Sequence, residues 1–289
     1  MPEMVERREN GIAYIERPGP GPVVVLLHGI GSNASSFMPL IECLPDHLHL
    51  ILWNAPGYMG SKPLAEAWPL PSDYARALAG LLDDIGISTV HLFGHSLGTL
   101  IAAEFARQHP NRVDRLVLAS AANGYGISQG DPLPEKAAGR IEELERLGPE
   151  VFARSRAANL VHEPAGHPDV VAHVEEAMAQ VRLPGYGQAV HMLASGDLAA
   201  MIGTVPVCPG FIIGAQDRIT PMDQTQKAAG AWAAVHGHAP ALIAIEEAGH
   251  AAYVQRPQRF ASALLELLGE PATRSAYCMA RKSNGENHV

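Results

Sequence analysis

Cysteine is scarce in this chain, and its three copies are scattered. Cys43, Cys208 and Cys278 are odd in number and show no Cys-x-x-Cys spacing among 289 residues. This pattern supports neither a disulfide framework nor a cysteine-bound zinc site. A reducing compartment suits such a chain, so we expect a cytoplasmic protein.

Clustered basic charge and long apolar runs are also missing. The formal net charge is -9, and only 18% of the residues are charged. Because nucleic acids and anionic membranes select clustered Lys and Arg, we expect neither as a partner. No segment approaches the roughly 20 apolar residues of a membrane helix. The charged N-terminal residues also lack the apolar stretch of a signal peptide. We therefore expect a small-molecule substrate as the partner, and the sequence is compatible with a homodimer.

Strand and helix patterns alternate through most of the chain, which predicts an α/β fold with a mainly parallel sheet. A sheet-entry strand is expected near residues 11–16. Further strands are expected near residues 23–27, 49–53, 89–93, 115–119, 211–214 and 241–245. A helix with Ser72 as its N-cap is expected between the second and third of these strands.

The alternation breaks between about residues 122 and 203, where only helical patterns occur. These helices are expected at residues 135–147, 150–160, 169–181 and 188–194. The pattern indicates a helical cap inserted into the core. We therefore divide the chain into an α/β core (1–121 and 204–270), a cap (122–203) and a flexible C-terminal tail (271–289).

The most informative motif is Gly94-His95-Ser96-Leu97-Gly98, which follows an apolar strand and precedes a helix. Gly-x-Ser-x-Gly in this setting is typical of a nucleophile elbow, a turn so tight that its flanking positions require glycine. The turn pushes the hydroxyl of Ser96 out above the sheet. Ser96 is therefore the candidate nucleophile.

Two later strand ends supply an acid and a base. Asp217 follows the strand expected at 211–214, and His250 follows the strand expected at 241–245. A serine hydroxyl needs a base to take its proton, and the base needs a carboxylate that fixes its tautomer. We assign these roles to His250 and Asp217, with Asp223 as a competing acid nearby.

Four motifs in this order, the fourth being His28-Gly29-Ile30-Gly31 after the first buried strand, resemble the α/β-hydrolases. Within that superfamily the chain is similar to the branch of esterases, enol-lactonases and carbon–carbon (meta-cleavage product) hydrolases. The resemblance implies an eight-stranded, mostly parallel sheet flanked by helices, with the cap over the site. It also implies an oxyanion hole built from the backbone N–H groups of Ile30 and Leu97, and no metal or cofactor.

The expected function is hydrolysis of a small carboxylic ester or lactone by a serine hydrolase. Hydrolysis of a carbon–carbon bond in a diketone ring-cleavage product is the first alternative. A non-catalytic ligand-binding protein on the same scaffold is an alternative from another class, because a fold does not dictate a function. A dinucleotide site at Gly29-Ile30-Gly31 is disfavoured, because Asn54 stands where the ribose-binding acid is required.

Overall fold

The structure is a computed structural model that describes residues 3–271. In this range a single sheet has eight strands in the order β1-β2-β4-β3-β5-β6-β7-β8. Only the β1–β2 and β2–β4 pairs are antiparallel. The mostly parallel sheet predicted from the sequence is therefore confirmed. The strands are β1 (Val5–Glu9), β2 (Ile12–Arg17), β3 (Val23–Leu27), β4 (His49–Trp53), β5 (Val90–His95), β6 (Val113–Ala119), β7 (Pro209–Gly214) and β8 (Leu242–Ile245).

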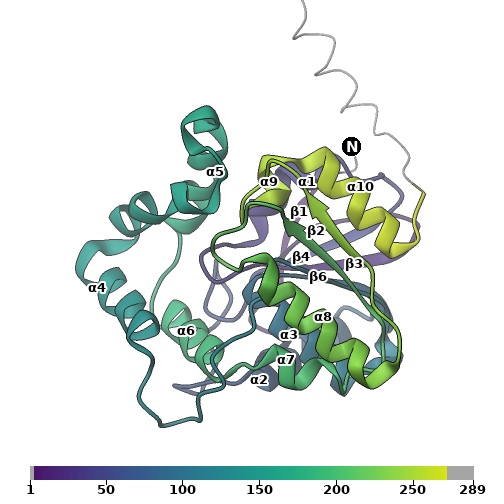
Figure 1. The fold of residues 1–289 in the computed structure, drawn as a ribbon, viewed down its shortest axis with the longest axis horizontal. Coiled ribbons are helices and arrows are strands. Elements are labelled where there is room, and N and C mark those ends of the chain that lie inside the picture. Colours follow the sequence, from purple (N-terminus) through teal and green to yellow (C-terminus); the bar gives the residue numbers. More distant parts are fainter. Residues whose placement is uncertain (1–2, 272–289) are drawn as a thin grey trace, which may run out of the picture.

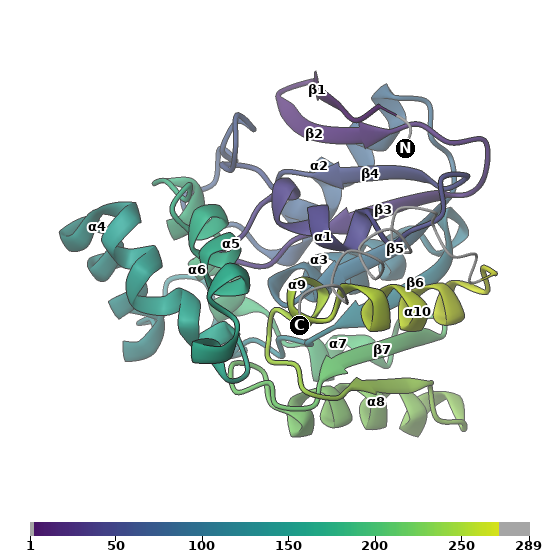
Figure 2. The ribbon, with the colours of Figure 1, turned by 90° about the horizontal axis from the view of Figure 1, so that it is seen from above.

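Central strands are apolar because helices cover both faces of the sheet. Residues Val24 to Leu27 of β3 are fully buried, as are Phe211 to Ile213 of β7. Such continuous apolar runs are typical of parallel strands with two covered faces. Figure 2 shows the strands side by side, with helices in front of and behind them.

The two faces of the sheet carry different helices (Figure 1). One face carries α1 (Met38–Ile41), α9 (Ala252–Gln255) and α10 (Pro257–Leu268). The other carries α2 (Pro71–Asp84), α3 (Leu97–Gln108), α7 (Leu198–Ile202) and α8 (Met222–His236). Ala102, Ala103 and Ala106 of α3 are fully buried, and their small side chains let this helix pack closely on the sheet.

The start of α2 differs from the prediction. The helix begins at Pro71, and its N-cap is Leu70 rather than Ser72. Proline suits the first helical position because that position needs no N–H donor. The Asp73 carboxylate accepts a 2.8 Å hydrogen bond from the backbone N–H of Leu70. This contact fixes the helix start without a serine cap.

Three further helices lie together beyond the carboxyl ends of the parallel strands (Figure 2). They are α4 (Glu135–Arg156), α5 (Pro168–Met178) and α6 (Gly185–Ser195). The expected break between the first two cap helices appears as a kink in α4, where Gly148 has φ 72° before Pro149. By contrast, α7 packs on α3 and α8 of the core. The exact cap boundaries, 122 and 203, stay a prediction.

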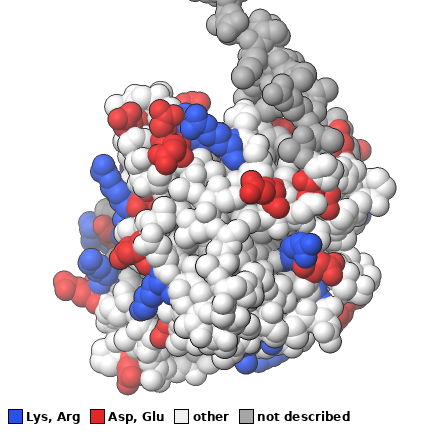
Figure 3. Space-filling view, turned by 45° about the vertical axis from the view of Figure 1, so that its right-hand side comes forward, with Lys and Arg blue, Asp and Glu red and all other residues white. Residues whose placement is uncertain are grey.

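Charge on the surface is mixed in sign. Figure 3 shows acidic and basic side chains of the described residues next to one another, without an extended basic area on that face. Within residues 3–271 no helix combines the length and apolar character needed to cross a bilayer. The predicted flexible tail, apart from Pro271, lies outside the described residues.

Candidate active site

Ser96 occupies a sharp turn between β5 and α3, with φ 52° and ψ -117°. A positive φ is rare for a residue with a side chain. A Cβ on Gly94 would lie 2.4 Å from the carbonyl oxygen of Gly98, and one on Gly98 would lie 2.5 Å from that of Leu27. Both flanking positions therefore require glycine, as the motif predicts.

Backbone and hydroxyl contacts hold this turn in place. The N–H of Ser96 donates to the Ala119 carbonyl at 2.9 Å. The Thr99 hydroxyl donates to the Ser96 carbonyl at 2.6 Å and accepts from the N–H of Ala122 at 3.2 Å. The turn is thus tied both to its own helix and to the end of β6.

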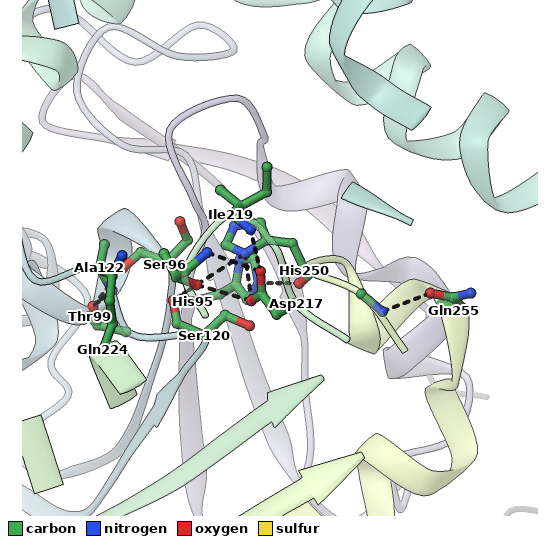
Figure 4. A network of polar contacts seen from close by, with 12 residues as sticks. His95, Ser96, Thr99, Ser120, Ala122, Asp217, Ile219, Gln224, His250 and Gln255 are labelled. Carbon is green, nitrogen blue, oxygen red and sulfur yellow. Dashed lines mark hydrogen bonds and ion pairs between the residues drawn. The ribbon is translucent and has the colours of Figure 1, made fainter. Parts of the chain in front are cut away.

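The structure brings His250 and Asp217 into direct contact beside this turn (Figure 4). His250 Nδ1 lies 2.9 Å from Asp217 Oδ2, and both residues are buried. This contact leaves Nε2 as the ring nitrogen available to a substrate or a nucleophile. Ser96 and His250 line the same cavity. No hydrogen bond joins the Ser96 hydroxyl to the His250 ring among the described residues, and such contacts often tighten only when substrate binds.

Asp217 is buried yet well supplied with donors. Its Oδ1 accepts from the N–H groups of Ile219 at 2.8 Å and Thr220 at 3.0 Å. The Thr220 hydroxyl lies 3.0 Å from Oδ2. Burial by itself raises the pKa of Asp217, but His250 and these donors outweigh it and lower that pKa below its ordinary value. Asp217 is therefore a carboxylate at neutral pH.

Asp223, the competing acid, lies elsewhere. It stands in the first turn of α8 and lines the cavity. Within the described residues it makes no hydrogen bond or ion pair with His250. The acid that contacts the His250 ring is Asp217.

The loop after β3 passes directly beside Ser96. A Cβ on Gly29 would lie 3.1 Å from the Ser96 Cβ and 3.6 Å from its Oγ. The Tyr58 hydroxyl donates to the Ile30 carbonyl at 2.6 Å, which fixes this loop. In the described residues the N–H groups of Ile30 and Leu97 donate to no protein acceptor. Leu97 is the first residue of α3, where helix N–H groups lack an internal partner.

Two buried histidines near the site are neutral structural groups. His28 Nδ1–H donates to the Gly29 carbonyl at 2.8 Å, and Nε2 accepts from the N–H of Ala55 at 3.0 Å. His95 Nε2–H donates to the His250 carbonyl at 3.0 Å. Burial lowers the pKa of His28 to about 4. Burial, followed by the nearby His250, lowers the pKa of His95 to about 3.

Gln255 joins the His250 loop to the cap. Its Oε1 accepts from the N–H groups of Gly249 and His162, both at 3.0 Å. Its Nε2 donates to the His162 carbonyl at 2.7 Å. The N–H of Ala251 also donates to the Leu160 carbonyl at 2.9 Å. The cap segment at Leu160 and His162 is therefore joined to the loop that carries His250.

The cavity between core and cap has a volume of about 480 Å³. Core residues contribute the Ser96 and His250 wall, and α4, α5 and α6 contribute the opposite wall. Met178 and Tyr186 of the cap line it, together with Arg140 and Arg156. Across residues 3–271, no three His, Cys, Asp or Glu side chains gather as a metal site would require.

Sequence reasoning assigned no role to Thr220, Gln255, Arg140 or Arg156. Thr220 could have been found, because an Asp whose side chain accepts from N–H groups two and three residues later is a common local turn. The partners of Gln255 include His162, 93 residues away, so no local pattern signals this contact. The two arginines have only helical spacing, which does not separate a pocket from an exposed face.

A family model and a full-length relative both resemble this chain. The family model described as "alpha/beta hydrolase fold" matches residues 22–141. A pimeloyl-[acyl-carrier protein] methyl ester esterase of Chromobacterium violaceum is 28% identical over 258 residues, 88% of this chain and 97% of that protein.

A second relative is more similar over a shorter stretch. The 2-hydroxy-6-oxononadienedioate/2-hydroxy-6-oxononatrienedioate hydrolase 1 of Dechloromonas aromatica is 35% identical over 130 residues, 43% of this chain and 44% of that protein. Among solved structures, the enol-lactonase from Burkholderia xenovorans superposes with a TM-score of 0.78 at 20% identity. That superposition covers 92% of this chain and 100% of the other.

Proposed function

Because the chain is an α/β-hydrolase, we propose that it hydrolyses a small carboxylic ester or lactone. Ser96 is the nucleophile, His250 the base, and Asp217 the acid that orients the base. The observation that carries this proposal is the convergence of Ser96 and His250 on one cavity, with Asp217 buried 2.9 Å behind the His250 ring.

The reaction begins with attack on the substrate carbonyl. As the Ser96 oxygen bonds to the carbonyl carbon, its proton passes to Nε2 of His250. The positive charge that develops on the imidazole ring is stabilised by the Asp217 carboxylate. A carbonyl bond that becomes a C–O⁻ group needs donors already aimed at it. The unpartnered N–H groups of Ile30 and Leu97 supply them, because the loop after β3 lies against the Ser96 side chain.

The tetrahedral intermediate then collapses. The C–O bond to the leaving group breaks, and His250 returns its proton to the leaving oxygen. For an ester the alcohol departs; for a lactone the new hydroxyl stays attached to the acyl chain. Water deprotonated by His250 attacks the acyl-enzyme, and the carboxylic acid is released with Ser96 restored.

Hydrolysis of a carbon–carbon bond is the second candidate. It is supported by the 35% identity to the Dechloromonas aromatica hydrolase, a relative in the branch that the sequence resembles. That similarity spans less than half of each chain, whereas the esterase from Chromobacterium violaceum matches along nearly its whole length. We therefore rank ester or lactone hydrolysis first.

A substrate panel tests this proposal. The purified protein is assayed with short p-nitrophenyl esters, lactones and ring-cleavage diketones, and Ser96→Ala is the control for each. We expect Ser96-dependent turnover of esters or lactones that EDTA leaves unchanged. Turnover of the diketones alone would favour the second candidate. Ligand binding by thermal shift, without turnover of any class, would instead support a non-catalytic protein.

A further inference from the structure

The cap wall of the cavity carries two arginines for which the proposed mechanism has no use. Arg140 and Arg156 both lie on α4 and line the same cavity as Ser96 and His250. The chain as a whole has a net charge of -9. A pair of guanidinium groups inside the pocket of an acidic protein therefore calls for an explanation.

Arg156 is held in place but is not saturated. Its guanidinium packs over the ring of Phe152 at 4.6 Å, and Nη2 forms an ion pair with Glu143. Its Nε is buried and has no hydrogen-bond partner among the described residues. A buried donor without a partner is destabilising, so the guanidinium of Arg156 is not fully satisfied by the protein itself.

Arg140 lies beside the hydroxyl of Tyr186. Burial raises the pKa of Tyr186, and the guanidinium of Arg140 acts against that rise. Within the part of the chain that the structure describes, Arg140 forms no ion pair. Glu143 can balance one of the two arginines, so about one positive charge is left without a contacting acid on this wall.

The remaining charges of the lining do not cancel this excess. Asp223 is the acid in the lining, and Lys227 lies one turn further along the same helix, α8. Side chains four residues apart on a helix are neighbours, so these two charges offset each other locally. Neither belongs to the wall built by α4.

We propose that Arg140 and Arg156 form a carboxylate-binding subsite, so that the natural substrate is an ester or lactone carrying a carboxylate several bonds from the scissile carbonyl. The planar guanidinium fork matches the geometry of a carboxylate. This inference rests on the proposed function, since it places the carboxylate relative to attack by Ser96.

The test compares two acyl chains of equal length that differ in terminal charge. Mono-p-nitrophenyl adipate and p-nitrophenyl hexanoate are assayed with wild type, Arg140→Met, Arg156→Met and the control Arg154→Met. Arg154 lies on the same helix, but its side chain is 73% exposed and it pairs with Glu175. We expect each pocket variant to lower the adipate-to-hexanoate ratio of kcat/KM by about 10- to 100-fold. The control keeps the wild-type ratio.

The hexanoate ester reports on folding and on the proposed function separately. Pocket variants should retain turnover of the hexanoate ester. Free adipate should inhibit the wild type, whereas its neutral diamide should not. Arg156→Lys, which keeps the charge without the fork, should give an intermediate ratio. Equal ratios in all variants with hexanoate turnover intact would overturn the subsite alone. Failure of the wild type to hydrolyse either ester would count against the proposed function instead.

Discussion

The two walls of the cavity are built on different principles. On the core wall, Ser96, Asp217 and His250 are each no more than 7% exposed, and they follow the ends of strands. Backbone geometry fixes the turn that carries Ser96, since Gly94 and Gly98 leave no room for a side chain. On the cap wall, α4 is kinked at Gly148, where an added Cβ would contact nothing within 4 Å.

In our proposal, the core wall supplies the chemistry and the cap wall supplies the selectivity. Groups that must be aligned to fractions of an ångström stand on rigid strand ends, where a small displacement costs rate. The groups that we propose to select the substrate, Arg140 and Arg156, stand on a helix, where side chains change without disturbing the sheet. We therefore expect core substitutions to lower turnover of every substrate, and cap substitutions to change the preference among substrates.

The largest effect should come from the core wall. Ser96→Ala should lower kcat by about 10⁴-fold or more, because the triad acts as a unit and only oxyanion and binding effects remain. Ser32→Ala provides a matched control, because Ser32 lines the same cavity. Substantial turnover in Ser96→Ala, measured on the best ester of the panel, would remove the distinction between the walls.

Neutralising Asp217 or Asp223 tests which of the two acids belongs to the core wall. Asp217→Asn should lower kcat by about 10³- to 10⁴-fold, because an amide cannot stabilise the imidazolium or hold the required tautomer. Asp223→Asn, which removes a carboxylate from the cavity rim, should leave kcat near the wild-type value. The opposite ranking in steady-state assays would mean that the acid has been misassigned.

Gln255 tests the contact between the two walls. Gln255→Leu removes the hydrogen bonds that join the His250 loop to the cap segment at His162. Because misplacement of a base lowers the rate, kcat should fall by about 10- to 100-fold with a smaller change in KM. Gln258→Leu, the same change at an exposed position of α10, is the control. An unchanged kcat in Gln255→Leu would show that the loop holds its position without the cap.

Acid stability offers a smaller and independent test of the core wall. His28 and His95 have pKa values lowered by burial to about 4 and about 3, whereas an unfolded histidine titrates near 6.5. Below about pH 6.5 these two histidines bind protons in the unfolded chain but stay neutral in the folded chain. Stability present at neutral pH is therefore lost as the pH falls towards those lowered values.

The variant His95→Gln isolates one of these groups and can still donate to the His250 carbonyl. Between pH 7 and pH 5, the wild type should lose about 2 kcal/mol more unfolding free energy than this variant. Urea denaturation at several pH values measures the difference. Parallel stability curves for the two proteins would mean that His95 takes up protons in the folded state.

The positions of Ser96, Asp217 and His250 could be predicted because local motifs signal them, and their catalytic roles stay a proposal. The strand–turn–helix setting of Ser96 follows from two glycines and an apolar run, and Asp217 and His250 follow their own strands. The start of α2 was missed because Asp73 reaches back to Leu70, a cap that needs no residue of the usual type at the N-cap.

The cap wall could not be predicted in the same way. An arginine at helical spacing looks the same whether it faces a cavity or water, and only the tertiary fold places Arg140 and Arg156 in the same cavity as Ser96. The hydrogen bonds of Gln255 likewise depend on His162, a partner 93 residues away. Contacts of this kind arise from packing between segments rather than from any local pattern.

Active-site labelling tests the central claim most directly. The protein is treated with a fluorophosphonate, digested and analysed by mass spectrometry, with Ser96→Ala and His250→Ala treated in parallel. The account predicts one labelled residue, Ser96, no label in Ser96→Ala, and much slower labelling in His250→Ala because the base is missing. Labelling of a different residue, or unlabelled protein that still hydrolyses esters, would contradict it.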